Sequence, residues 1–209
     1  MLKFLNGIEL AQDPKLSHSM FEDRTYQFKT RLKWDVTIDE RGLEKDQYDL
    51  PRAIYVVETD NNGHHLGSMR FLPMNRATML SDVFDYLLPE QGLKSAEYWE
   101  CTRFCIGQNA SRTTAAKVLG GGAKLLLELK LSGFLGVFDR RMLRCYRMLG
   151  ALPEVLATRG NGASELNLGK WSFDSNTFRD LMTSAALSSD ELELSFVNSS
   201  LLLNDSHAA

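Results

Sequence analysis

Apolar and polar positions along the chain follow helical and strand periods in clear blocks. Apolar residues at helical spacing predict helices over 17–32, 78–88, 111–129 and 140–149, with Ser111 as a cap and Gly150 as a stop. β-Branched and aromatic runs predict strands over 53–59, 66–72, 95–106, 134–138 and 152–158. Asn61-Asn62-Gly63 predicts a hairpin turn between the first two strands. The polar stretch 35–52, broken by Gly42 and Pro51, predicts a long loop.

This order of elements favours an α/β sandwich on one central sheet. The 209 residues are enough for one domain, 1–209, and the Ser/Asn-rich segment from about 198 predicts a flexible tail. No apolar run approaches membrane-spanning length, and the N-terminus lacks a signal-peptide pattern, so we expect a cytoplasmic protein without stable membrane association. A net charge of −3 argues against nucleic acid as a general partner.

Three features of the sequence favour structural interpretations. Cys101, Cys105 and Cys145 lie in apolar elements, which predicts buried free thiols in a reducing compartment. His64-His65 follows the hairpin turn and is interpreted as part of it, so no metal site is predicted. Gly120-Gly121-Gly122 lies within a predicted helix and indicates close packing of that helix on the sheet.

Two charged residues interrupt the strand Trp99-Glu100-Cys101-Thr102-Arg103-Phe104. Unpaired charges are costly inside a strand, so Glu100 and Arg103 need partners or a task. In a regular strand Glu100 and Thr102 share one face and Arg103 points to the other, although a bulge would change this geometry. A structural ion pair and a functional site both remain open here.

The same anomaly occurs in the helix predicted over 17–32. Phe21, Phe28 and Leu32 form an apolar stripe, and Arg24 falls inside it. Together with downstream positions, these residues stand in the order and spacing of a known family. The matching positions are Arg24, Phe28, Trp34, Asp46, Asp49, Arg70, Phe71, Phe84, Glu100 and Arg103. Between about Phe21 and Gly150 the chain therefore resembles the LuxI-type acyl-homoserine lactone synthases.

The resemblance implies a fold and a reaction. The implied fold is an N-acetyltransferase-like three-layer sandwich around one central, mostly antiparallel twisted sheet. The implied reaction moves an acyl group from acyl carrier protein to the amine of S-adenosylmethionine. The methionine moiety then closes to a lactone and methylthioadenosine leaves, giving a quorum-sensing signal. S-adenosylmethionine is a substrate in this scheme, and no cofactor is implied.

The matched residues take roles by the same resemblance. Glu100 is the candidate base for the amine, and the other expected catalytic residues are Arg103, Arg24 and Asp46. The expected contacts of S-adenosylmethionine are Phe28, Trp34, Asp49, Arg70 and Phe84, with Trp34 suited to a cation–π contact with the sulfonium. Phe28, Trp34 and Phe84 are also compatible with a plain core.

The acyl chain and its carrier have candidate residues as well. Met79, Thr102, Phe104, Leu126 and Gly136 are expected to contact the chain, although a plain core role is open for Met79, Phe104 and Leu126. Gly136 stands where family members that make 3-oxo signals have a threonine, and we expect glycine to leave space there. A threonine hydroxyl there can hydrogen-bond the 3-oxo group, whereas glycine offers no side-chain donor, so the expected signal is unsubstituted or 3-hydroxy and of medium or long chain length. Arg140, Arg144 and Arg147 share a helix face that suits an acidic carrier protein, or simply a solvated surface.

Two other functions remain open at this point. One is a coenzyme A-dependent N-acyltransferase of the same fold. The junction Gly107-Gln108-Asn109-Ala110-Ser111-Arg112 lacks repeated glycines, which disfavours a tight diphosphate cradle. The other is a non-catalytic member of the fold that only binds a ligand.

Overall fold

The computed structural model describes residues 1–89 and 96–203. Within these residues, seven strands form one sheet in the order β1-β2-β3-β4-β5-β7-β6. The pair β4–β5 is parallel and the other pairs are antiparallel. The strands are β1 (Leu2–Asn6), β2 (Ile54–Thr59), β3 (His65–Pro73), β4 (Tyr98–Ile106), β5 (Gly133–Asp139), β6 (Glu154–Arg159) and β7 (Leu166–Trp171).

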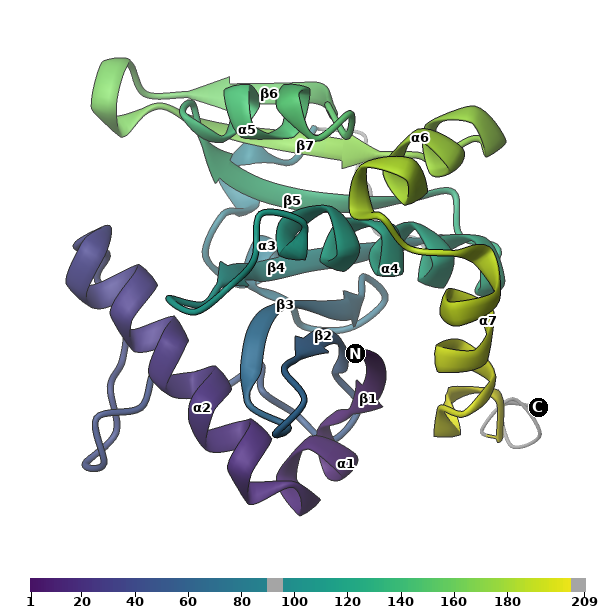
Figure 1. The fold of residues 1–209 in the computed structure, drawn as a ribbon. Coiled ribbons are helices and arrows are strands. Elements are labelled where there is room, and N and C mark those ends of the chain that lie inside the picture. Colours follow the sequence, from purple (N-terminus) through teal and green to yellow (C-terminus); the bar gives the residue numbers. More distant parts are fainter. Residues whose placement is uncertain (90–95, 204–209) are drawn as a thin grey trace.

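Helices cover both faces of this sheet. The α-helices are α1 (Gly7–Gln12), α2 (Pro14–Arg24), α3 (Met79–Asp82), α4 (Thr114–Glu128), α5 (Met142–Met148), α6 (Ser175–Ala185) and α7 (Ser189–Val197). A π-helix spans Thr25–Arg31, and 3-10 turns span Asp85–Leu87, Gly162–Ser164 and Ser200–Leu203. Figure 1 shows α1 and α2 beside the β1–β3 end of the sheet, and α5 beside β6 and β7 at the other end.

The two faces of the sheet bury separate apolar clusters. On β2, Ile54 and Val56 belong to the cluster that includes α4, whereas Tyr55 and Val57 belong to the cluster under α2. This alternation follows from the two-residue period of a strand. A mostly antiparallel sheet between helical layers confirms the predicted fold class.

The predicted hairpin and the strands after it are confirmed, but some details differ. Residues 2–6 form β1, which has no strand prediction because the run is short and leads directly into α1. Helix α4 begins at Thr114, so Ser111 is not its cap; the Ser111 carbonyl accepts from the Thr114 amide at 3.3 Å instead. The helix predicted over 78–88 is interrupted between α3 and the turn at Asp85.

The helix predicted over 17–32 widens after Arg24 into the π-helix. Thr25 stands at the change: its hydroxyl donates to the Phe21 carbonyl at 3.0 Å and to the Gly42 carbonyl at 2.9 Å. Such side-chain bonds compete with the regular helix ladder, and π-turns are frequent at functional sites. The predicted long loop follows, closed by a bridge between Ile38 and Glu44.

Some sequence predictions fall partly outside the described residues. Ser95, the expected start of the strand predicted over 95–106, lies outside them, as do residues 204–209 of the expected tail. In residues 198–203, Ser199 is buried and the Ser200 hydroxyl accepts from the side-chain Nδ2 of Asn6 at 3.2 Å. No helix among the described residues is long and apolar enough to cross a membrane.

Of the three consecutive glycines of α4, Gly121 and Gly122 pack against the sheet, as predicted, whereas Gly120 faces α6. A Cβ on Gly121 would lie 2.5 Å from Cγ1 of Val56 and 3.0 Å from Cδ2 of Leu2. A Cβ on Gly120 would meet only Sδ of Met182 at 3.5 Å, an ordinary contact. Close approach of α4 to the sheet therefore requires glycine at 121 but not at 120.

This contrast gives a paired stability prediction. Gly121→Ala should lower the free energy of unfolding by about 1–2 kcal/mol, because overpacking against β1 and β2 outweighs the gain in helix propensity. Gly120→Ala should raise it by up to about 1 kcal/mol, through propensity alone. Urea denaturation of both variants tests this, and equal shifts in midpoint would contradict the packing argument.

Candidate active site

A bulge in β4 brings Arg103 to the same side of the sheet as Arg70. The β3–β4 register shifts between Ser68 and Arg70, where β4 carries an extra residue, and Arg103 has a left-handed backbone with φ 53°. A bulge of this kind re-aims the side chain that it carries. The regular-strand expectation that Arg103 faces away from Thr102 is therefore wrong, because the extra residue reverses its direction.

Three arginines and three carboxylates form one buried network. Arg24 binds Glu44 at 2.5 Å and binds Asp49 with two bonds of 2.8 and 3.0 Å. Arg70 binds Asp46 at 2.6 and 3.0 Å and Asp49 at 2.8 Å. Arg103 binds Glu44 at 2.9 Å and Asp46 at 2.8 Å. Each arginine meets two acids and each acid meets two arginines, so the formal charges cancel.

The energetics of this network depend on mutual pairing. Burial works against the charged form of Arg24, but Asp49 and Glu44 outweigh it and raise the Arg24 pKa above its ordinary value. Burial would likewise raise the pKa of Asp49, yet Arg24 and Arg70 hold that pKa well below its usual range. Paired and hydrogen-bonded ions are tolerated in an interior, whereas single ones are not.

The loop that supplies the acids is fixed by its own hydrogen bonds. The Glu44 amide donates to the Thr25 hydroxyl at 2.7 Å, and the Asp46 amide donates to Asp49 at 2.9 Å. The Tyr55 hydroxyl also donates to Asp49 at 2.8 Å. Glu44 is the one member of the network that is not among the predicted site residues, because Glu44-Lys45 has the pattern of an ordinary solvated pair in a polar loop. The number of predicted charges could have indicated it: if three arginines are buried together, two aspartates do not balance them and a third acid is needed.

Glu100 lies beside this network without an ion pair in it. Glu100 is 1 % exposed, and its Oε2 accepts from the Met79 amide at 3.0 Å at the start of α3. Burial raises the pKa of Glu100 to about 7, although Arg70 and the nearby amides favour the charged form. A carboxyl group that titrates near neutrality is suited to accept a proton from a substrate.

Aromatic rings adjoin the network on the side of the π-helix. Phe28 and Trp34 stack with their centroids 5.2 Å apart and an interplanar angle of 3°. The Arg103 guanidinium lies 5.5 Å from the Phe28 centroid, while Trp34 is 38 % exposed. Phe28, Trp34 and Arg103, which are all predicted site residues, therefore lie together. Phe84, another predicted residue, is half-buried and has a ring contact with Tyr86, in a separate apolar cluster.

The residues predicted for the acyl chain lie in different places. The Thr102 hydroxyl accepts from Nε of Arg70 at 3.1 Å, which places it on the network side of β4. Met79 touches Arg103 through its sulfur at 3.3 Å. Phe104 lies toward Tyr146, with centroids 6.3 Å apart, and Leu126 is fully within the main core. A chain-binding role for these residues stays a prediction.

The expected space at Gly136 does not exist. A Cβ there would lie 2.9 Å from both the carbonyl oxygen and Sγ of Cys101, and 3.1 Å from Trp171. Gly136 lies just beyond the last β4–β5 pair, Glu100 with Leu135, where the two strands stop pairing. Glycine at 136 thus permits close contact between strands and leaves no opening.

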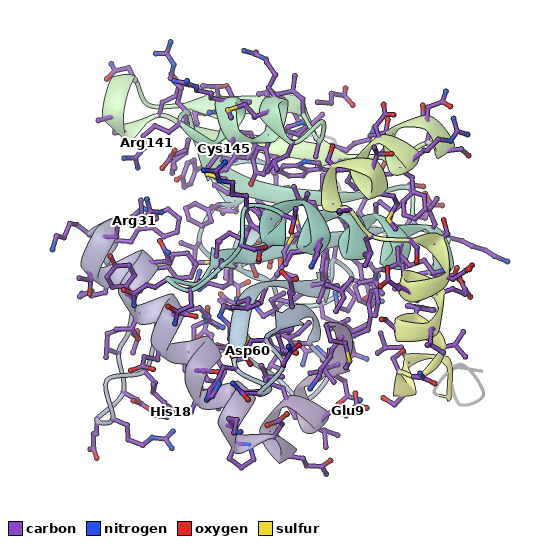
Figure 2. All side chains as sticks on the ribbon, viewed as in Figure 1. Glu9, His18, Arg31, Asp60, Arg141 and Cys145 are labelled. Atoms are coloured by element: carbon purple, nitrogen blue, oxygen red, sulfur yellow. The ribbon has the colours of Figure 1, made fainter. Side chains whose placement is uncertain are left out.

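Two further sequence interpretations need correction. Cys145 is exposed and Cys101 is half-buried, so only Cys105 is buried as predicted; Figure 2 shows Cys145 on α5, near Arg141. His65 is not a turn residue: it begins β3 and is buried, with its ring between Asp23 and Ser68. Among the described residues no His, Cys, Asp and Glu cluster suited to a metal ion is found.

The predicted docking arginines are accessible. Arg140, Arg144 and Arg147 are all exposed along α5 and the residues just before it. Arg140 lies 3.9 Å from Glu165, a weak surface pair. Among the described residues Arg144 and Arg147 have no ion-pair partner.

An open cavity of about 450 Å³ adjoins the network from the side of α1 and α2. Asp49 and Tyr55 line it together with Phe21, His18 and Lys45. Neither Glu100 nor Arg103 lines this cavity, so it reaches the acid loop and not the candidate base.

Known proteins resemble this chain in sequence and in fold. A family model described as autoinducer synthase matches residues 8–154. An acyl-homoserine-lactone synthase of Rhizobium etli is 32% identical over 188 residues, covering 87% of this chain and 88% of that protein. The structure of the synthase LasI superposes with a TM-score of 0.75 at 22% identity, covering 88% of this chain and 94% of that chain. BjaI, described as a coenzyme A-dependent synthase with SAM and isopentyl-CoA, gives 0.80 at 15% identity, covering 94% and 99%.

The network predicts a specific cost for losing Glu44. Glu44→Gln should lower the free energy of unfolding at pH 7 by about 3 kcal/mol, because Arg24 and Arg103 would keep buried charge without its counter-ion. Glu40→Gln, an exposed change in the same loop, is the matched control and should shift stability by less than about 0.5 kcal/mol. Guanidinium denaturation of both variants measures this, and similar midpoints would contradict a shared buried network.

Proposed function

Since this chain belongs to the autoinducer synthase family, an acyltransferase family of acyl-homoserine lactone synthases, we propose that its substrates are S-adenosylmethionine and an acyl group carried by acyl carrier protein. The acyl group forms an amide with the substrate amine, the methionine moiety closes to a lactone, and methylthioadenosine leaves. The observation that carries the proposal is Glu100, a buried carboxylate with a pKa of about 7 beside a charge-balanced arginine network.

Glu100 supplies the base that the first step requires. An α-amino group has a pKa of about 7.7–8.0 and is mostly protonated at neutral pH, so it cannot attack a thioester until a proton is removed. Glu100 accepts that proton directly or through one water. Its raised pKa makes it half ionised near pH 7 and close in proton affinity to the amine. The free amine then attacks the acyl carbonyl carbon, and the thiol of the carrier arm leaves.

The network and its rings hold the cationic substrate. Asp46 and Arg103 are its most accessible members, with side-chain exposures of 13 % and 7 %. Asp46 receives the substrate ammonium, and Arg103 receives the methionine carboxylate. Arg24, Arg70 and Asp49 are more deeply buried and position these two. Trp34, stacked on Phe28 and partly exposed, offers a ring to the sulfonium.

Support for S-adenosylmethionine also comes from the neighbours in fold. BjaI was solved with SAM and separately with MTA, and TofI was solved with an inhibitor and MTA.

Lactone closure then needs mainly orientation, because the carboxylate attacks the carbon next to the sulfonium within one molecule.

A single assay separates this function from its alternatives. The chain is incubated with S-adenosylmethionine and either acyl carrier protein or coenzyme A bearing the same acyl group. Release of methylthioadenosine together with an acyl-homoserine lactone supports the synthase. Free coenzyme A without methylthioadenosine would instead support an N-acyltransferase, and no turnover with any donor would support a binding module.

Removing the base should slow turnover without unfolding the protein. Glu100→Gln is expected to lower kcat by about 10²-fold or more at pH 7, as loss of a general base does. Wild-type kcat should rise with pH through an inflection near 7, where Glu100 ionises. Methylthioadenosine release measured from pH 5.5 to 9 tests both, and a variant with wild-type turnover would exclude Glu100 from the mechanism.

The same variant should be more stable than the wild type at high pH. The folded pKa of Glu100 lies above the ordinary 4.5, so its ionisation disfavours folding increasingly as pH rises from about 4.5 to 7. Glutamine removes this cost. Unfolding midpoints should therefore be similar at pH 4 and higher for the variant at pH 8; the reverse order would mean that Glu100 is stabilised as an anion.

The arginines of α5 should affect only the carrier substrate. Arg144→Glu with Arg147→Glu is expected to raise the KM for acyl carrier protein about tenfold and to leave the KM for S-adenosylmethionine unchanged, because complementary charge steers an acidic partner. Arg159→Glu with Arg179→Glu, two exposed reversals on β6 and α6 with the same total change in charge, is the control for net charge. Equal effects of the two sets, or a parallel change in both KM values, would reject this docking surface.

A further inference from the structure

The carboxylate of Asp23, a residue of α2, contacts the loop between the Glu100 strand and the next helix. This loop, residues 107–113, joins the end of β4 to the N-terminus of the 15-residue helix α4. Free backbone N–H groups at such a junction bind phosphate groups, helped by the helix dipole. Here the Gln108 amide donates to Oδ1 of Asp23 at 3.3 Å. The Asp23 carboxylate therefore already uses one of the backbone donors that this junction could offer to a phosphate.

Other amides of the loop are also in use. They donate to neighbouring oxygens within the loop and the first turn of α4, at 3.1 to 3.3 Å. The bonds are Ala110 to the Gly107 carbonyl, Ser111 to the Thr114 hydroxyl and Thr114 to the Ser111 carbonyl. The loop is therefore folded on itself, and a diphosphate would have to displace several of these bonds.

Asp23 is held in this position from two sides. Its Oδ2 contacts Nδ1 of His65 at 2.7 Å, and Nε2 of the same ring contacts the Ser68 hydroxyl at 2.9 Å. His65 and Ser68 are buried on β3. On the other side, a Cβ on Gly107 would lie 2.3 Å from Oδ2 of Asp23, so only glycine admits the carboxylate this close. The Asp23 carboxylate is thus a fixed charge, 16 % exposed.

We propose that Asp23, fixed by His65 and Gly107, selects the acyl donor by excluding the diphosphate of coenzyme A from this loop. This proposal depends on the proposed function, and it identifies Asp23 as the residue that determines which acyl donor the protein uses. Coenzyme A brings a diphosphate and a further phosphate on its nucleotide, whereas the arm of a carrier protein brings one phosphodiester. A like charge at the binding point weakens the binding of an anionic ligand and acts mainly against the more highly charged donor.

The test compares donors in variants at position 23. Asp23→Asn removes the charge and can keep both contacts if His65 changes tautomer, and Asp23→Ala also frees the Gln108 amide. The ratio of kcat/KM for acyl-coenzyme A to that for acyl carrier protein, measured with one acyl group, should rise about tenfold or more in both variants. Glu22→Gln, an exposed charge change next to it in α2, should leave the ratio unchanged.

A binding measurement keeps the test independent of turnover. Calorimetry with coenzyme A alone should show no binding to the wild type and measurable binding to Asp23→Asn. A wild type that uses acyl-coenzyme A as well as acyl carrier protein, or an unchanged ratio and no binding in both variants, would overturn the proposal. If the wild type releases no methylthioadenosine with any donor, the proposed function fails, and the calorimetric comparison still decides the role of Asp23.

Discussion

Mutual neutralisation of three arginines and three carboxylates is the constraint on which the rest of this site depends. Arg24 comes from α2, Arg70 from β3 and Arg103 from β4, and the loop between the π-helix and β2 supplies the acids. Buried ions of this kind persist only as a complete set, because each one left over keeps its desolvation cost. The network therefore fixes where helix, loop and strands meet. Glu100 lies beside the network without an ion pair in it, and burial raises its pKa to about 7 even though Arg70 favours the charged form.

The sequence predicts this site in part, and the reason is physical. Charges at Arg24 and at Glu100 and Arg103 stand out because they interrupt apolar patterns that would otherwise be continuous, so their convergence can be expected. The direction of Arg103 cannot be predicted, since a bulge is one extra residue with no composition signal of its own. Glu44 is missed for the opposite reason: it lies in a polar loop, where an acid is ordinary.

The same limits apply to the fold. Strong periodicity predicts the hairpin, the Glu100 strand and the glycine-packed helix, whereas the short edge strand β1 carries too few residues to show a period. The expectation of space at Gly136 is wrong because the volume that a glycine leaves can be taken up by the neighbouring strand, here by Cys101 of β4. From sequence alone, His65 is interpreted as part of the turn, because its contact with Asp23 exists only in the tertiary structure.

Titration of Glu100 tests the central claim most directly. Carboxyl ¹³C NMR of the substrate-free protein, labelled at glutamate and assigned by comparison with Glu100→Gln, follows this group separately from the exposed glutamates. We expect a midpoint near pH 7 for Glu100, well above its ordinary 4.5. A midpoint near 4.5 would show that an arginine of the network stabilises Glu100 as an anion, and would contradict both the complete pairing of the network and the role of Glu100 as the base.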